Sequence, residues 1–432
     1  MIGPVSRCHG VHTSPSELRA PTPWSWPLLS LNFFMADMQA GIGPFLGVFL
    51  LAHGWQSGAI GTVLTIGGAA GVLATAPIGA LVDATRRKRL CVVVPGILAV
   101  LASGLVLVSQ APMLVALSQV VAGISAAAIG PAVTGLTLGL VRQAGFNRQL
   151  GRNQAFNHGG NVAGAGLSGL LGWQFGFVAV FWLAAAFAIL SIASVLLISA
   201  DAIDHDAARG LHHEGAVQDR VSGLSVLVDS RPLLILAAAL FGFHLGNAAM
   251  LPLYGLAVVA SGQGDPAGFV AITIVVAQAV MVVASLVAMR LVDRRGYWLV
   301  MLVSFVVLPV RGFLAAHLIT HWGVYPVQIL DGIGAGLQSV AVPGLVARIL
   351  DGTGRVNVGQ GAVMTAQGLG AALSPAIGGW IAQEIGYPAM FLTLGGCALG
   401  SVALWLAYAP RLRQACAGGA GAPRGRLAAL TP

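Results

Sequence analysis

Long apolar runs alternate with short polar or charged stretches from residue 28 to residue 408. Most of the runs are about 20 residues long, which is enough for a helix to cross a hydrocarbon core of ~30 Å. Their charged and turn-forming borders predict twelve transmembrane helices. These are expected at 28–51, 57–80, 90–110, 112–140, 154–173, 175–199, 232–259, 266–289, 297–318, 323–348, 357–382 and 388–408.

The composition supports a membrane protein. Of the 432 residues, 57% are hydrophobic and only 8% are charged, whereas a soluble domain carries roughly a quarter charged residues. The four cysteines are far apart, without the spacing of a metal site or a disulfide framework. The sequence also contains no phosphate-binding glycine loop and no nucleophile motif. We therefore predict an all-α membrane protein that is not an enzyme and requires no metal or cofactor.

The positive charges indicate the topology. The net charge is +8, and all but one of the 22 Lys and Arg residues lie in the two tails or in the loops after every second predicted helix. Such a bias marks the cytosolic side, so both termini are expected in the cytosol. Because the charges do not form one stripe, nucleic-acid binding is not predicted. The Ala-, Gly- and Arg-rich composition favours the inner membrane of a bacterium.

A hydrophilic stretch divides the twelve spans into two sets of six. The expected segments are a tail at 1–27, a first half at 28–199, a loop at 200–231, a second half at 232–408 and a disordered tail at 409–432. The halves repeat at a nearly constant offset, through Pro44 and Pro252, Asp83 and Asp293, Gln119 and Gln328, and Gly172 and Gly379. Two related six-helix halves are typical of secondary transporters, which bind their substrate between the halves.

The loop after the second span carries the most specific motif, Gly-Ala-Leu-Val-Asp-Ala-Thr-Arg-Arg-Lys at 79–88. It resembles the loop motif of the major facilitator superfamily, usually Gly-x-x-x-Asp-Arg-x-Gly-Arg-Arg/Lys, although Ala84 and Arg86 depart from it. The second half repeats Asp-Arg-Arg-Gly at 293–296, with Met289 in place of the first glycine. The residues assigned to this motif are Gly79, Asp83, Arg86, Arg87, Lys88, Asp293 and Arg294.

The resemblance covers all twelve spans and implies a monomer with two pseudo-symmetric halves that works by rocker-switch alternating access. It also implies that the motif forms a charge cluster at a cytosolic gate, where a helix N-terminus and arginines pair with Asp83. The alternative is that these bases only fix the topology. The fifth span lacks the proline of the bend found in the superfamily's drug antiporters, which counts against that subclass.

Ionisable and amide side chains inside the spans are candidates for function, because burying them without partners costs several kcal/mol. By the resemblance, spans 1, 4, 7 and 10 line the substrate cavity. The candidate cavity residues are Gln39, Gln119, His244, Asn247, Gln328 and Asp331, with Asn161 in span 5. Asn161, with Asn157 and His158, either lines the cytosolic mouth or solvates a glycine-rich helix.

Two acids lie well inside spans, Asp37 and Asp331. A carboxyl group at the depth of Asp37 is suited to carry a proton between two access states, with His244 as a relay. The alternative is that Asp37 braces the helix near Pro44. Arg311 and Asp331 lie at matching depths on consecutive helices, which favours a structural ion pair over contact with a charged substrate.

These observations predict a secondary transporter of a small organic solute, with protons as the coupling ion and the bilayer as its surroundings. A proton-driven effluxer of drugs or metabolites and an uncoupled facilitator remain open, as does a membrane sensor that binds a ligand without moving it.

Overall fold

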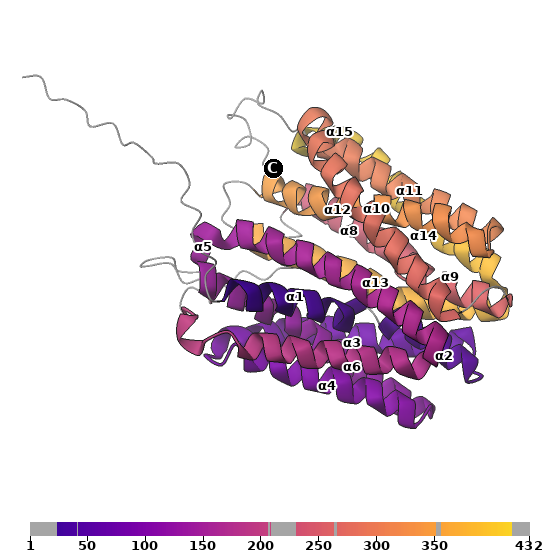
Figure 1. The fold of residues 1–432 in the computed structure, drawn as a ribbon. Coiled ribbons are helices and arrows are strands. Elements are labelled where there is room, and N and C mark those ends of the chain that lie inside the picture. Colours follow the sequence, from indigo (N-terminus) through magenta and orange to yellow (C-terminus); the bar gives the residue numbers. More distant parts are fainter. Residues whose placement is uncertain are drawn as a thin grey trace, which may run out of the picture.

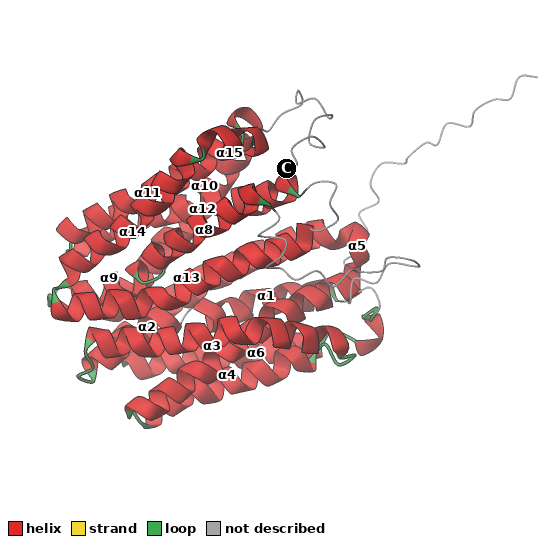
Figure 2. Cartoon of the chain, turned by 180° about the vertical axis from the view of Figure 1, so that it is seen from behind, coloured by secondary structure: helices red, strands yellow, loops and turns green. Residues whose placement is uncertain are grey.

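The computed structural model describes residues 24–40, 42–205, 208, 230–262, 266–350 and 356–416. All regular structure in these ranges is helical (Figure 2). Inside a bilayer a helix satisfies its own backbone hydrogen bonds, which apolar spans of this kind require. The side chains of a few residues within the helices, among them Asp37, Gln39 and Asp83, lie outside the description.

The first half consists of α1 (Ser25–Ala40), α2 (Ile42–Ala52), α3 (Ser57–Ala84), α4 (Leu90–Val108), α5 (Pro112–Phe175) and α6 (Phe177–Leu196), followed by the short η1 (Ala200–Ala202). The second half consists of α8 (Arg231–Asn247), α9 (Met250–Ala260), α10 (Pro266–Arg295), α11 (Tyr297–His317), η3 (His321–Gly323), α12 (Val324–Ile349), α13 (Val356–Glu384), α14 (Tyr387–Ala407) and α15 (Ala409–Cys416). Figure 1 shows these halves as two helical bundles.

The prediction of an all-α membrane protein is confirmed. Nine stretches in the described ranges are long and apolar enough to cross a bilayer. The other three predicted spans correspond to α1 with α2, to the second part of α5, and to α13. The described helices are therefore consistent with twelve crossings.

The first span of the second half consists of α8 and α9, which are separated only by Ala248 and Ala249. Both residues keep helical φ and ψ angles, so the span continues through them. Pro252 of this span repeats Pro44 of the first half at an offset of 252 − 44 = 208 residues.

The segment between the fourth and fifth spans differs from the prediction. It was expected to be a loop near 141–153, but α5 continues through it with a kink at Arg142, whose φ is 54°. A non-glycine residue at positive φ is strained. An ion pair of 3.1 Å between Arg142 Nη2 and Asp204 Oδ2 lies at this kink. Arg142 and Arg152 of this segment are exposed, as their charges predict, but exposure alone does not distinguish a helix from a loop.

A buried polar network stabilises the helix beyond the kink. Asn153 Nδ2 donates to Thr137 Oγ1 at 2.9 Å, and Gln149 Nε2 donates to Asn153 Oδ1 at 2.9 Å. All three side chains are at most 5% exposed. The network therefore ties the two parts of α5 to each other across the kink.

We expect Asn153→Leu to lower the free energy of unfolding by ~1–3 kcal/mol, because it leaves the buried Gln149 amide without its partner and removes one of the two hydrogen bonds of the Thr137 hydroxyl. Denaturant titration in mixed micelles measures this change. Arg152→Leu is the matched control, because Arg152 is exposed and its replacement should change stability by less than ~0.5 kcal/mol. Equal losses in the two variants would show that the network is not stabilising.

We call the end of the molecule that carries Arg87, Arg142, Arg231, Arg294 and Arg413 the basic end. Its counterpart, where α2 ends and α9 ends, is the opposite end. Both views show the two bundles converging where α2 and α9 lie and lying farther apart toward the basic end (Figures 1 and 2). The halves meet mainly where α3 packs on α13, α5 on α10 and α2 on α9, and α2 also contacts α10.

Hydrogen bonds between α3 and α13 or α14 begin at the opposite end and continue into the middle of the helices. Successive bonds join Ser57 to Tyr387 (2.7 Å), Gly58 to Gln383 (3.1 Å), Thr62 to Trp380 (3.0 Å) and Thr65 to Ala376 (2.9 Å). A Cβ atom at Gly61 would overlap the carbonyl oxygen of Pro375. Nearer the basic end, a Cβ at Gly79 or Gly361 would meet nothing within 4 Å. The close contact of α3 with α13 thus belongs to the opposite end.

The predicted tail from residue 409 also needs correction, because its first residues form α15. Leu412 of this helix is fully buried, and the guanidinium of Arg413 lies 4.2 Å from the centre of the Trp298 ring. One apolar side chain and one cation–π contact hold this segment against α11, a pairing that the Ala- and Arg-rich composition does not indicate. Most of the predicted loop at 200–231 and the tails 1–23 and 417–432 lie outside the described residues.

Candidate functional site

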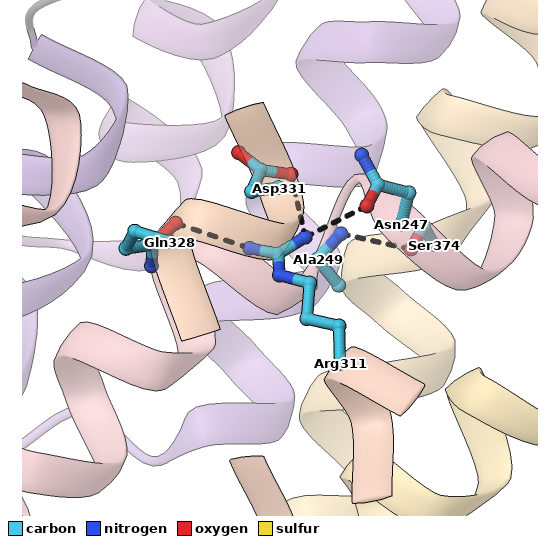
Figure 3. A network of polar contacts seen from close by, with 6 residues as sticks. All are labelled: Asn247, Ala249, Arg311, Gln328, Asp331 and Ser374. Atoms are coloured by element: carbon cyan, nitrogen blue, oxygen red, sulfur yellow. Dashed lines mark hydrogen bonds and ion pairs between the residues drawn. The ribbon is translucent and has the colours of Figure 1, made fainter. Parts of the chain in front are cut away.

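Three polar side chains surround Arg311 in the second half, close to the junction between α8 and α9 (Figure 3). Arg311 Nη1 lies 2.7 Å from Asp331 Oδ1 and donates to Asn247 Oδ1 at 2.7 Å. Its Nη2 donates to Gln328 Oε1 at 3.3 Å. The guanidinium of α11 thus joins α8 to two residues of α12.

Burying the charged side chains of this cluster costs free energy unless they are paired. The side chain of Arg311 is 1% exposed and that of Asp331 is 14% exposed. A charge at this depth is tolerated only with a counter-charge and hydrogen bonds. Two donors, Arg311 Nε and Gln328 Nε2, are buried without a partner among the described residues. The cluster therefore retains donor capacity that these partners do not use.

The junction between α8 and α9 lies beside the cluster. Ala248 and Ala249, which separate the two helices, keep helical φ and ψ angles. The backbone N–H of Ala249 donates to Ser374 Oγ of α13 at 2.9 Å. A side chain of another helix thus pairs with one backbone donor at membrane depth, where such groups need a partner.

The space beside the cluster is small. A cavity of about 10 Å³ lies between Phe243, Asn247, Arg311, Asp331 and Gly334. That is at the lower limit for one water molecule. In this arrangement the cavity beside the cluster is therefore too small to hold a solute.

The other predicted cavity residues do not join this cluster. His244 Nδ1 bonds to the carbonyl of Leu240 in its own helix at 2.9 Å. Gln119 lines a separate large pocket within the first half. Asn161 Nδ2 donates to Asn157 Oδ1 at 3.4 Å, on the same helix. Asp37 and Gln39 are on α1, but their side chains lie outside the described part.

The residues of the predicted gate motif lie at the basic end. Arg86, Arg87, Asp293 and Arg294 are exposed. Among the described side chains, none of these four is in an ion pair. Lys88, in contrast, is buried, and its Nζ donates to the carbonyl of Val82. The Asp83 side chain lies outside the description, so its pairing with arginines stays a prediction.

Two contributors were not predicted from the sequence. Ser374 of α13 accepts a hydrogen bond from the backbone N–H of Ala249, and the only signal for it in the sequence was the neighbouring Pro375. Gln278 Oε1 forms a hydrogen bond of 3.1 Å with His158 Nδ1, which links α10 to α5 across the two halves. Gln278 is the one polar residue in the apolar stretch 274–284 of α10, and that isolation was the available signal.

Comparison with known proteins identifies the family. The sequence profile described as Major Facilitator Superfamily matches residues 28–357 and, in a second match, 268–429. The chain belongs to the major facilitator superfamily. It is 41% identical over 382 residues to an uncharacterized MFS-type transporter of Mycobacterium tuberculosis, recorded in two strains, covering 88% of this chain and 91% of that protein.

Solved structures show the same fold for this major facilitator transporter. A mutant form of the nucleoside transporter NupG aligns with a TM-score of 0.74 and 16% identity, covering 89% of this chain and 99% of that one. A second NupG structure aligns with a TM-score of 0.70 and 15% identity, covering 89% and 98%. At these identities the likeness concerns the fold, and the predicted superfamily fold is confirmed.

Proposed function

We propose that this major facilitator protein transports a small polar organic solute by rocker-switch alternating access, as a proton-coupled monomer. The basic end faces the cytosol and the opposite end faces outward. The observation that carries the proposal is the one-sided contact between the halves, which are hydrogen-bonded from Ser57 to Thr65 but do not pack closely at Gly79. A transporter caught open to one side has this arrangement.

Solute specificity follows from the chemistry of the cluster. Its partly exposed groups are the Asp331 carboxylate and the Asn247 amide, beside the buried amide of Gln328 and one buried cation that is already paired. This set suits a neutral solute that forms several hydrogen bonds better than a multivalent anion. Movement of the halves would have to widen the small cavity beside Asp331 before a solute could enter it.

Proton coupling is assigned to Asp37, with His244 as its relay. Besides Asp331, whose carboxylate is paired with Arg311, Asp37 is the only acid well inside a predicted span. An acid in low dielectric can bind and release a proton as its exposure changes. Asp331 is less suited to this task, because its protonation would leave Arg311 buried and unpaired.

The test is solute-driven proton movement in proteoliposomes. A thermal-shift screen with nucleosides, hexoses and amino-acid amides first identifies a solute that stabilises the purified protein. Adding that solute should acidify or alkalinise the vesicle interior in wild type, and Asp37→Asn should reduce this change more than tenfold. Counterflow exchange of the labelled solute should stay within about twofold.

Asp201→Asn, an exposed site in η1, is the matched control and should behave as wild type. If Asp37→Asn moves protons normally, coupling does not involve Asp37. If wild type exchanges solute without any pH change, the protein is an uncoupled facilitator. Binding without any flux would instead indicate a sensor.

A further inference from the structure

A large apolar pocket lies inside the first half, away from the Arg311 cluster. Its volume is about 1040 Å³, at the upper end of the range for small-molecule sites. It occupies the space between α3 and α4, which follow each other in the chain. Because α3 packs mainly on α5 and α13 while α4 packs on α5 and α6, the two helices leave this space between them.

Glycines form the deep wall of the pocket. At Gly123 of α5 a Cβ atom would overlap the carbonyl oxygen of Gly67 in α3, and at Gly67 a Cβ would lie 2.9 Å from the carbonyl oxygen of Gln119. The two backbones are therefore in direct contact, as at small-residue interfaces in membranes. Gly368 and Ala372 of α13 complete the wall, so the pocket also touches the second half.

The pocket opens sideways toward lipid in the half of the membrane at the opposite end. Its rim includes Leu101 and Trp182, which are 63% and 69% exposed. Along α4 it extends from Ala99 to Val108, about 14 Å at 1.5 Å per residue. This is about half of a ~30 Å hydrocarbon core, or one leaflet. The described lining residues include no ionisable side chain.

The side-chain amide of Gln119 has few hydrogen-bond partners in this apolar lining. Gln119 is seven residues from the start of α5, about 10 Å from the opposite end. Its Nε2 donates to Ser118 Oγ at 3.4 Å, and the described residues offer its amide no other hydrogen bond. A ligand in the pocket that pairs with this half-buried amide would supply the hydrogen bonds that the apolar lining does not.

We propose that this pocket binds a neutral lipophilic small molecule that carries one hydrogen-bonding group and enters from the leaflet at the opposite end. The amide of Gln119 recognises the polar group, and α3, α4 and α6 enclose the apolar part. The site is separate from the polar cluster of the proposed transport path. Because α13 contributes to its wall, an occupant contacts both halves and senses their relative movement.

The test uses quenching of Trp182 fluorescence by bromododecanol and by bromododecane, which differ only in the hydroxyl group. The chain has nine tryptophans, so the signal is the difference between wild type and Trp182→Phe in detergent micelles. We expect saturable quenching by bromododecanol and an apparent affinity at least about fivefold higher than for bromododecane. Gln119→Leu should weaken bromododecanol binding about tenfold.

Gln360→Leu of α13 is the matched control, because it makes the same change outside the pocket and should leave binding unaltered. Ala122→Phe, which fills the pocket, should abolish the Trp182 signal. Equal, non-saturating quenching by both probes would overturn the proposal, as would an unchanged affinity in Gln119→Leu. Saturation by brominated phosphatidylcholine alone would assign the pocket to a lipid acyl chain instead. None of these results depends on solute transport.

Discussion

Asp331→Asn is expected to lower the free energy of unfolding by ~3–5 kcal/mol, because it leaves the fully buried Arg311 without a counter-charge. Denaturant titration of the purified protein in mixed micelles measures the change. The same substitution at the exposed Asp201 controls for the loss of one carboxylate and should cost less than ~0.5 kcal/mol.

A double variant separates stability from function. Arg311→Met with Asp331→Leu removes both charges, and replacing a buried pair by apolar residues is often neutral or stabilising. We expect this variant to recover most of the stability that Asp331→Asn loses, short of wild type because the Asn247 and Gln328 amides lose their donor. It should lose more than tenfold in solute flux, since those amides lose the cation that orients them. A double variant that transports normally would make the cluster purely structural. An Asp331→Asn variant of wild-type stability would show that Arg311 is not buried as a charge.

Gly61→Val is expected to open the opposite end. Its side chain would overlap the carbonyl of Pro375 where α3 meets α13, and overpacking of this kind costs ~1–3 kcal/mol. Because the contact joins the two halves, the penalty applies only while that end is closed, and the population should shift about 5- to 150-fold. Labelling of Ser57→Cys by a membrane-impermeant maleimide, with the native cysteines replaced by alanine, measures the shift.

Gly123→Val is the matched control, because it creates the same kind of overlap with Gly67 inside one half. It should reduce stability without increasing the labelling of Ser57→Cys, since α3 and α5 stay together in both states. If Gly61→Val and Gly123→Val increase labelling equally, the contact at Gly61 does not control access.

The sequence predicts this fold well because lipid imposes one strong requirement, an apolar helix of fixed length, and positive loops then fix the orientation of the helices across the membrane. Depth along a helix follows directly from residue number, and Arg311 and Asp331, which were expected at the same level, form an ion pair. Rotation about the helix axis does not follow from residue number. Gln119 was therefore expected between the halves, whereas it faces the pocket beside α4.

Contacts between helices that are far apart in the chain could also not be predicted from the sequence. The hydroxyl of Ser374 reaches the backbone of Ala249, 125 residues away, and nothing in either segment indicates its partner. The helical segment after Arg142 was read as a loop because charge and glycine are typical of loops at a membrane surface. Its buried network depends on how Asn153 faces Thr137, which only the packed structure defines.

The packing of α15 has a practical consequence for handling the protein. Arg413 of this helix covers the Trp298 ring at the surface of the basic end, and Leu412 is fully buried. A truncation after Ala407 would uncover this apolar ring, so detergent-solubilised protein shortened there should self-associate. Purification tags and fluorescent fusions are better attached beyond Cys416, where the covering helix is preserved.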